Sequence, residues 1–158
     1  MVLTKEIVSR NIGITGETFD IDKVYKGTKE KGESLGYGFV EQEQSSKPGK
    51  YGHELRFKFL FVKEVDDFGM NEMEFEFNFE NLSKIKGKDH GDCGIKIKCR
   101  QTIDYKNRWG KTALNRFLLG VYSKVIDGEV KKKYIIPLIQ DSNAMHDCIK
   151  ELFGFYIA

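Results

Sequence analysis

Two stretches in the middle of the chain alternate between apolar and polar side chains, with Leu60 as the exception. Every second residue is apolar in 55–61 and 73–79, at Leu55, Phe57, Phe59, Phe61, Met73, Phe75, Phe77 and Phe79. Because successive side chains on a strand point to opposite faces, each stretch predicts a strand with one apolar face. Asp66, Asp67 and Gly69 between them are turn residues, so the two strands are expected to form an antiparallel hairpin.

The alternation also predicts the register of this hairpin. If Asp67 is the centre of the turn, Phe57 faces Phe77 on the apolar side and Lys58 faces Glu76 on the polar side. The same register pairs Phe59 with Phe75, and Phe61 with Met73. A slip by one residue would expose every Phe to water, so the register is strongly specified.

Two further strands extend this hairpin on either side. Residues 95–103 alternate in the same way and carry Lys96, Lys98 and Arg100 on the polar face, so an acidic row (Glu72, Glu74 and Glu76) should lie between two basic rows. On the other side, Pro48 and Gly49 suit the centre of a turn, so 36–46 should pair with 51–63. The sequence thus predicts an antiparallel meander with the acidic strand in the middle.

The N-terminal part and one later stretch show weaker patterns. Val2–Val8 and Thr18–Tyr25 are β-leaning runs and are predicted to be short strands. The stretch 26–38 contains four Gly, which predicts a mobile loop. Residues 82–94 are polar and are predicted to be an exposed connection.

Helical spacing begins after residue 110. In 111–126 the apolar positions follow a 3.6-residue period, at Leu114, Phe117, Leu118, Val121 and Val125. An alternative makes 121–126 and 129–136 the strands of a hairpin that turns at Asp127 and Gly128. Val130–Ile136 is predicted to be a strand in either case. Asp141 or Ser142 should cap a last helix. The apolar stripe of this helix should pack on the Phe face of the sheet and consists of Met145, Cys148, Ile149, Leu152 and Phe153.

These elements predict an α+β fold: a twisted antiparallel β-meander of five to seven strands with one or two C-terminal-half helices packed on its apolar face. We expect a single globular domain over residues 1–158. No apolar run reaches the length of about 18 residues that a membrane span needs, and Met1–Gly13 lacks the apolar core of a signal peptide. We therefore expect a cytoplasmic protein whose three Cys are reduced thiols.

Charge is unevenly distributed, although the net charge is only +2. Residues 84–133, which we call the basic region, contain 14 Lys or Arg and 5 Asp or Glu. Within it the candidate partner-binding residues are Lys106, Arg108, Trp109, Lys111, Arg116, Lys131, Lys132 and Lys133. If Lys96, Lys98 and Arg100 are balanced by the acidic row, only the remaining cations are available to a partner.

Three functional hypotheses follow. The favoured one is a non-enzymatic intracellular binding module that presents the basic region to an acidic protein partner. The alternative is a nucleic-acid-binding protein that uses the same residues, with Trp109 available to stack on bases. A further alternative is a carrier that holds a small apolar ligand in a Phe-lined cup. We expect no membrane partner.

Catalytic and metal motifs are weak. Gly110, Lys111 and Thr112 resemble the end of a P-loop, but Tyr105 occupies the position of the first glycine. Zinc-type ligands occur at His90, Cys93, His146 and Cys148, yet the last two would diverge on a helix. No histidine lies in a recognisable catalytic motif. We therefore expect neither a metal nor a cofactor and favour a non-enzymatic role.

Overall fold

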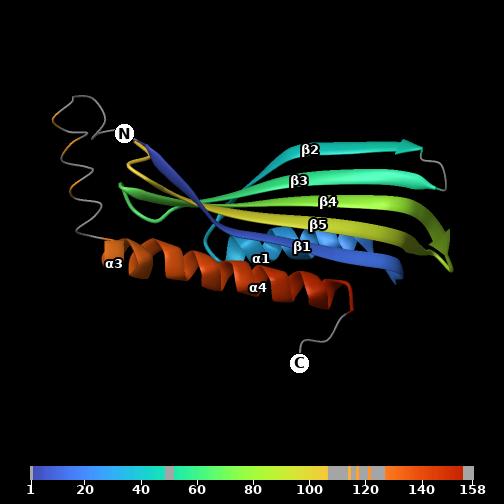
Figure 1. Ribbon diagram of the computed structural model, residues 1–158. Helices are drawn as coiled ribbons and strands as arrows, with labels where there is room; N and C mark the ends of the chain where they lie inside the picture. Colours follow the sequence, from blue (N-terminus) through green and yellow to red (C-terminus); the bar gives the residue numbers. More distant parts are fainter. Residues whose placement is uncertain are drawn as a thin grey trace.

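A five-stranded antiparallel sheet in the order β1-β5-β4-β3-β2 forms one layer, and helices form the other (Figure 1). The computed structural model describes residues 2–48, 52–106 and 127–154 and the single positions 114, 117 and 121. The strands are β1 (Leu3–Phe19), β2 (Gly38–Pro48), β3 (His53–Glu64), β4 (Gly69–Ile85) and β5 (Lys88–Ile103). The predicted α+β fold with a β-meander is confirmed.

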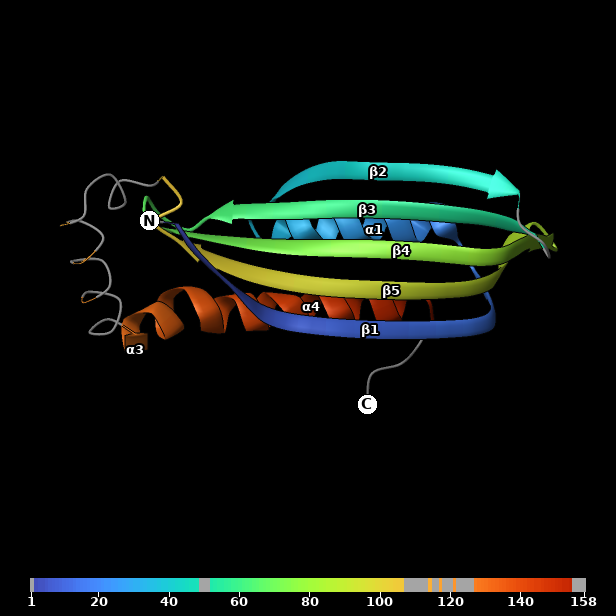
Figure 2. The same ribbon diagram turned by 45° about the horizontal axis from the view of Figure 1, so that its top comes forward.

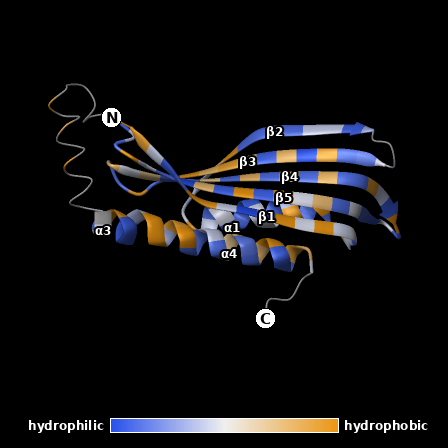
Figure 3. Cartoon of the chain, in the orientation of Figure 1, coloured by the Kyte–Doolittle hydropathy of each residue, from blue (hydrophilic) through white to orange (hydrophobic). Residues whose placement is uncertain are grey.

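The predicted hairpin register is confirmed residue by residue. Phe57 pairs with Phe77, Phe59 with Phe75, and Phe61 with Met73, while Lys58 pairs with Glu76. Figure 3 shows the resulting alternation of hydrophilic and hydrophobic residues along the strands. The six Phe side chains of β3 and β4 are at most 3% exposed, and their rings contact one another, as in the edge-on pair of Phe61 and Phe75 with centroids 5.4 Å apart.

The charged rows on the opposite face of the sheet also lie where the alternation places them. Glu74 of β4 accepts from Arg100 of β5 at 2.8 Å and lies 3.1 Å from Lys58 Nζ of β3. Glu76 forms a 2.8 Å ion pair with Arg56. The acidic strand therefore lies between two basic strands and neutralises part of their charge.

Two long helices, α1 (Ile21–Ser34) and α4 (Ile136–Leu152), cover the Phe face (Figure 2). The predicted strand Thr18–Tyr25 is wrong beyond Phe19, and the predicted loop 26–38 is wrong up to Ser34. Asp20 follows β1 and caps α1 by accepting from the Lys23 amide at 3.2 Å. The glycines that suggested a loop serve helix packing instead. A Cβ at Gly32 would collide with the ring of Phe61, so glycine lets α1 approach the sheet.

The predicted exposed connection 82–94 is also wrong. Strand β4 continues to Ile85 and β5 begins at Lys88, so most of this stretch is paired in a long hairpin. The turn consists of Lys86 and Gly87, which both have positive φ, 53° and 80°. This is the backbone conformation of a tight two-residue hairpin turn, and the polar composition concealed it.

The predicted strand Val130–Ile136 is helical in the structure. Helix α3 (Asp127–Val130) leads through the π-helical segment η1 (Lys131–Ile135) directly into α4. Pro137 cannot donate a backbone hydrogen bond to the preceding turn, and just before it the Ile136 amide reaches the carbonyl of Lys131, five residues back. The chain thus enters α4 already helical.

The predicted cap of the last helix at Asp141 or Ser142 is wrong, because α4 begins at Ile136. Asp141 instead accepts a 2.8 Å hydrogen bond from the Tyr37 hydroxyl, and Ser142 is buried. The predicted packing of this helix is correct: Met145, Ile149 and Phe153 are buried in the same cluster as the Phe residues.

Candidate partner-binding surface

Four of the eight candidate basic-region residues lie in the described part of the chain. Lys106 follows β5, and Lys131, Lys132 and Lys133 form the exposed start of η1. Arg108, Trp109, Lys111 and Arg116 lie outside the described residues. Figure 1 shows the end of β5, the β3–β4 turn and α3 at the same end of the sheet, so the fold brings the described lysines together.

Asp66 in the β3–β4 turn organises this end of the molecule. Its Oδ1 accepts from the amides of Phe68 and Gly69 at 2.8 and 2.7 Å, which closes the turn. Its Oδ2 accepts from the Tyr134 hydroxyl at 2.6 Å and lies 2.7 Å from Lys133 Nζ. Burial alone would raise the pKa of Asp66, but these hydrogen bonds hold the pKa well below its usual range.

The same turn also contacts the residues that follow β5. The Tyr105 hydroxyl donates to the main-chain carbonyl of Asp66 at 2.6 Å, and Lys106 Nζ lies 2.7 Å from Asp67 Oδ1. A Cβ at Gly69 would collide with the Tyr134 ring, so this glycine lets η1 pack directly on the hairpin. Lys106 and Lys133 are therefore held in place by carboxylates, which reduces the local positive field.

An exposed apolar stripe lies within the basic region. Leu114, Phe117 and Val121 have helical geometry, and their spacing of three and four residues places them on one face of a helix. They are 65%, 67% and 48% exposed. The expectation that this stripe packs on the sheet is wrong for these three residues, because α1 occupies that space together with α4.

Sequence reasoning missed the exposure of this stripe for a physical reason. An apolar face with helical spacing is required equally for a helix that packs on its own sheet and for one that docks on another molecule. The pattern of the stripe alone does not distinguish the two. The identification of α1 as a helix would have been the useful clue, because it would have filled the second helix position.

The outer sheet face carries cations that are less neutralised. Lys96 and Lys98 of β5 are exposed, and in the described part of the chain neither has an ion pair within 4.0 Å. On β1 their cross-strand neighbours are the uncharged Asn11 and Ser9. Across β4 they lie opposite Glu76 and Glu74, on the same face as the acidic row, so they add positive charge there without a close ion pair.

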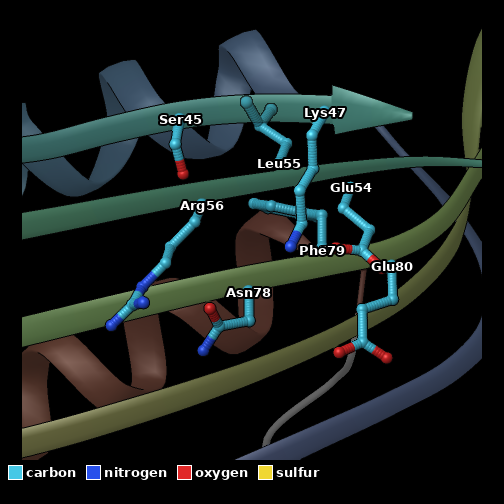
Figure 4. A pocket seen from close by; sticks show the side chains of 8 residues that line it. All are labelled: Ser45, Lys47, Glu54, Leu55, Arg56, Asn78, Phe79 and Glu80. Atoms are coloured by element: carbon cyan, nitrogen blue, oxygen red, sulfur yellow. Dashed lines mark ion pairs between the residues drawn. The ribbon is translucent and has the colours of Figure 1, made fainter. Parts of the chain in front are cut away.

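Two surface hollows are lined by mixed charges. One, of about 220 Å³, lies on β2, β3 and β4 (Figure 4) and is lined by Ser45, Lys47, Glu54, Leu55, Arg56, Asn78, Phe79 and Glu80. The other, of about 590 Å³, lies where β1 meets α1, beside the β4–β5 turn and the C-terminal end of α4. In both, lysines or arginines accompany carboxylates, so neither hollow selects a ligand of one charge.

The four zinc-type ligands noted in the sequence do not form a site. In the described ranges, which include His90, Cys93, His146 and Cys148, no group of three or more His, Cys, Asp or Glu could hold a metal ion. Cys93 is buried in the core cluster, and its burial raises its thiol pKa to about 12. All three cysteines are free thiols.

Comparison with known proteins gives no family assignment. No protein-family model matches the chain, and no curated protein matches it with significant similarity. Within the described ranges, no helix combines the length and the apolar character that crossing a bilayer requires. Functional inference for this chain therefore depends on the surface itself.

Proposed function

We propose that the protein is a non-enzymatic, cytoplasmic binding module whose basic region contacts an acidic protein partner. The observation that carries this proposal is the exposed stripe of Leu114, Phe117 and Val121 inside that region. Burying a Leu or Phe side chain is worth about 1.5–3 kcal/mol, so leaving two of them in water is costly unless a partner covers them.

The spacing of the stripe suits a particular mode of binding. Apolar side chains at positions i, i+3 and i+7 are the anchors of a helix that docks into an apolar groove. The surrounding region carries 14 Lys or Arg against 5 Asp or Glu, so a groove with an acidic rim is electrostatically complementary. The apolar anchors would supply affinity, and the charges would supply orientation and association rate.

The nucleic-acid alternative has less support. Lys106 and Lys133 lie 2.7 Å from the carboxylates of Asp67 and Asp66, and Arg100 is paired with Glu74. These carboxylates weaken the positive field that phosphate binding requires. The apolar-ligand alternative gains no support from the core, because the Phe side chains of β3 and β4 pack on one another and on the helices.

Two variants test the proposal: Leu114→Ser with Phe117→Ser, and Lys131→Glu with Lys132→Glu and Lys133→Glu. Cross-linking in the cells that produce the protein, followed by identification of the captured proteins, should yield an acidic partner with the parent chain. Each variant should reduce its recovery at least about tenfold, since a hot-spot residue contributes about 2 kcal/mol or more. Val40→Ser, at an apolar residue of β2 that is 52% exposed and lies outside the basic region, is the control.

A second measurement separates the protein partner from nucleic acid. Mixed-sequence single-stranded and double-stranded DNA should show little binding at low salt, where phosphate contacts are strongest. If DNA does bind, and if the lysine reversals abolish this binding while Leu114→Ser with Phe117→Ser leaves it intact, the partner is nucleic acid and not an acidic protein. An acidic partner that both variants retain at full recovery would refute the proposal.

A further inference from the structure

Strand β2 forms an edge of the sheet, with no described strand on its outer side. Within the described sheet it pairs with β3 only, and ten of its eleven residues are exposed, Phe39 being the exception. Figures 1 and 2 both show β2 along the outer border of the sheet. An edge of this kind presents backbone N–H and C=O groups that another strand can pair with.

The opposite edge, β1, is less suited to strand pairing. Its pairing with β5 is interrupted twice, between Glu6 and Val8 and between Ile14 and Glu17. A helix packs beneath each edge: α4 beneath β1, where Arg10 donates to Asn143, and α1 beneath β2, where Tyr25 donates to Glu41, so the interruptions are what distinguish the two. Bulges of this kind twist a strand away from a flat template. Strand β2 has one such interruption, between Glu41 and Glu43, and then runs regularly from Glu43 to Pro48.

The regular part of β2 is complementary in charge to itself. Glu43, Ser45 and Lys47 pair across with Lys58, Arg56 and Glu54, so all three point to the outer face of the sheet. If two β2 strands pair antiparallel about Ser45, Glu43 of each copy lies opposite Lys47 of the other. Both side chains already contact β3 but remain 44% and 75% exposed, so each can accept a second partner.

We propose that β2 pairs with β2 of a second copy of this chain, centred on Ser45, so that the two sheets join into one. The two symmetry-related Glu43–Lys47 pairs set the register. The same charges disfavour pairing with a strand of a different pattern, because like charges directly opposite each other on adjacent strands are destabilising. This edge is separate from the basic region, so the proposal does not depend on the proposed binding function.

Charge reversal provides the test, with the oligomeric state measured by sedimentation at protein concentrations up to roughly 100 μM. The parent chain should form a dimer. Glu43→Lys places two lysines opposite each other, and Lys47→Glu places two glutamates there. Each single variant should raise the dimer dissociation constant at least about tenfold, because both symmetric pairs change from attraction to repulsion. Glu17→Lys, a charge reversal on β1, is the matched control and should not change it.

Two combinations make the test specific to this register. A mixture of the Glu43→Lys and Lys47→Glu chains should form a heterodimer, because their charges are again complementary. The double variant Glu43→Lys with Lys47→Glu should dimerise like the parent chain. A parent chain that remains monomeric, a dimer that Glu43→Lys does not weaken, or a mixture no more associated than its components would each overturn the proposal. None of these outcomes would affect the acidic-partner proposal, which concerns other residues.

Discussion

The two faces of the sheet are made by the same strands but are stabilised in different ways. On the helix-covered face, Phe57, Phe75 and Phe77 are almost fully buried and contact one another and the helices. On the open face, Glu74 lies between Lys58 and Arg100 and remains in contact with water. Burial of apolar area is worth much more per residue than a solvent-exposed ion pair. The covered face therefore supplies most of the stability, the open face supplies the surface charge, and both faces specify the register.

The largest change in the free energy of unfolding is expected at Phe77, on the covered face. Replacing Phe77 by Ala leaves a cavity in the centre of the aromatic cluster and should lower the free energy of unfolding by about 3–5 kcal/mol. The next residue, Asn78, lies on the open face and contributes one hydrogen bond to Glu76. Asn78→Ala should cost less than about 1 kcal/mol in the same urea titration. Similar losses for the two variants would show that the faces do not differ as described.

A smaller loss is expected at Gly32, where α1 approaches the covered face. Alanine favours an isolated helix over glycine by about 1 kcal/mol, but here its Cβ would collide with the ring of Phe61. Gly32→Ala should therefore destabilise the protein, by about 1–3 kcal/mol, as overpacking does. Glu30→Ala on the exposed side of α1 is the control and should be nearly neutral. A stabilised Gly32→Ala chain would mean that α1 does not pack closely on the sheet.

On the open face, Glu74→Gln tests the ionic network directly. This change removes the carboxylate that lies 2.8 Å from Arg100 and 3.1 Å from Lys58, and it should cost about 1 kcal/mol, with the loss shrinking at high salt. Glu80→Gln, near the end of the same strand, should have almost no effect. A loss that does not depend on salt would point to packing instead of charge.

The smallest expected effect is on the loss of stability at acidic pH. The pKa of Glu76 is lowered, first by the hydrogen bond from Asn78 and also by the charge of Arg56. Burial acts in the opposite direction but does not cancel these effects. A carboxyl group with a lowered pKa in the folded state stabilises the protein above its unfolded pKa, and this contribution is lost as the pH falls below about 4. Glu76→Gln should therefore reduce the stability difference between pH 7 and pH 3. If thermal unfolding gives the same stability difference between pH 7 and pH 3 for the variant and the parent chain, Glu76 does not contribute to the pH dependence.

The register of the central hairpin was predictable from the sequence because it depends on local alternation. Each strand has its own apolar face, and only one alignment places Phe57 opposite Phe77 while Lys58 meets Glu76. The acidic row between two basic rows follows from the same rule. Helix α1 was not predictable in this way, because Gly27 and Gly32 resemble loop residues until the side chains they accommodate are known.

For the candidate surface too, some properties follow from the sequence and others only from the tertiary structure. The sequence alone determined that residues 84–133 are basic and that Leu114, Phe117 and Val121 share a helical face. Only the tertiary structure decided that these three side chains are exposed, that Asp66 and Asp67 contact Lys133 and Lys106, and that β2 is an edge. Alternation and charge are properties of neighbouring residues. Burial, ion pairing and strand order depend on segments far apart in the chain, which meet only when it folds.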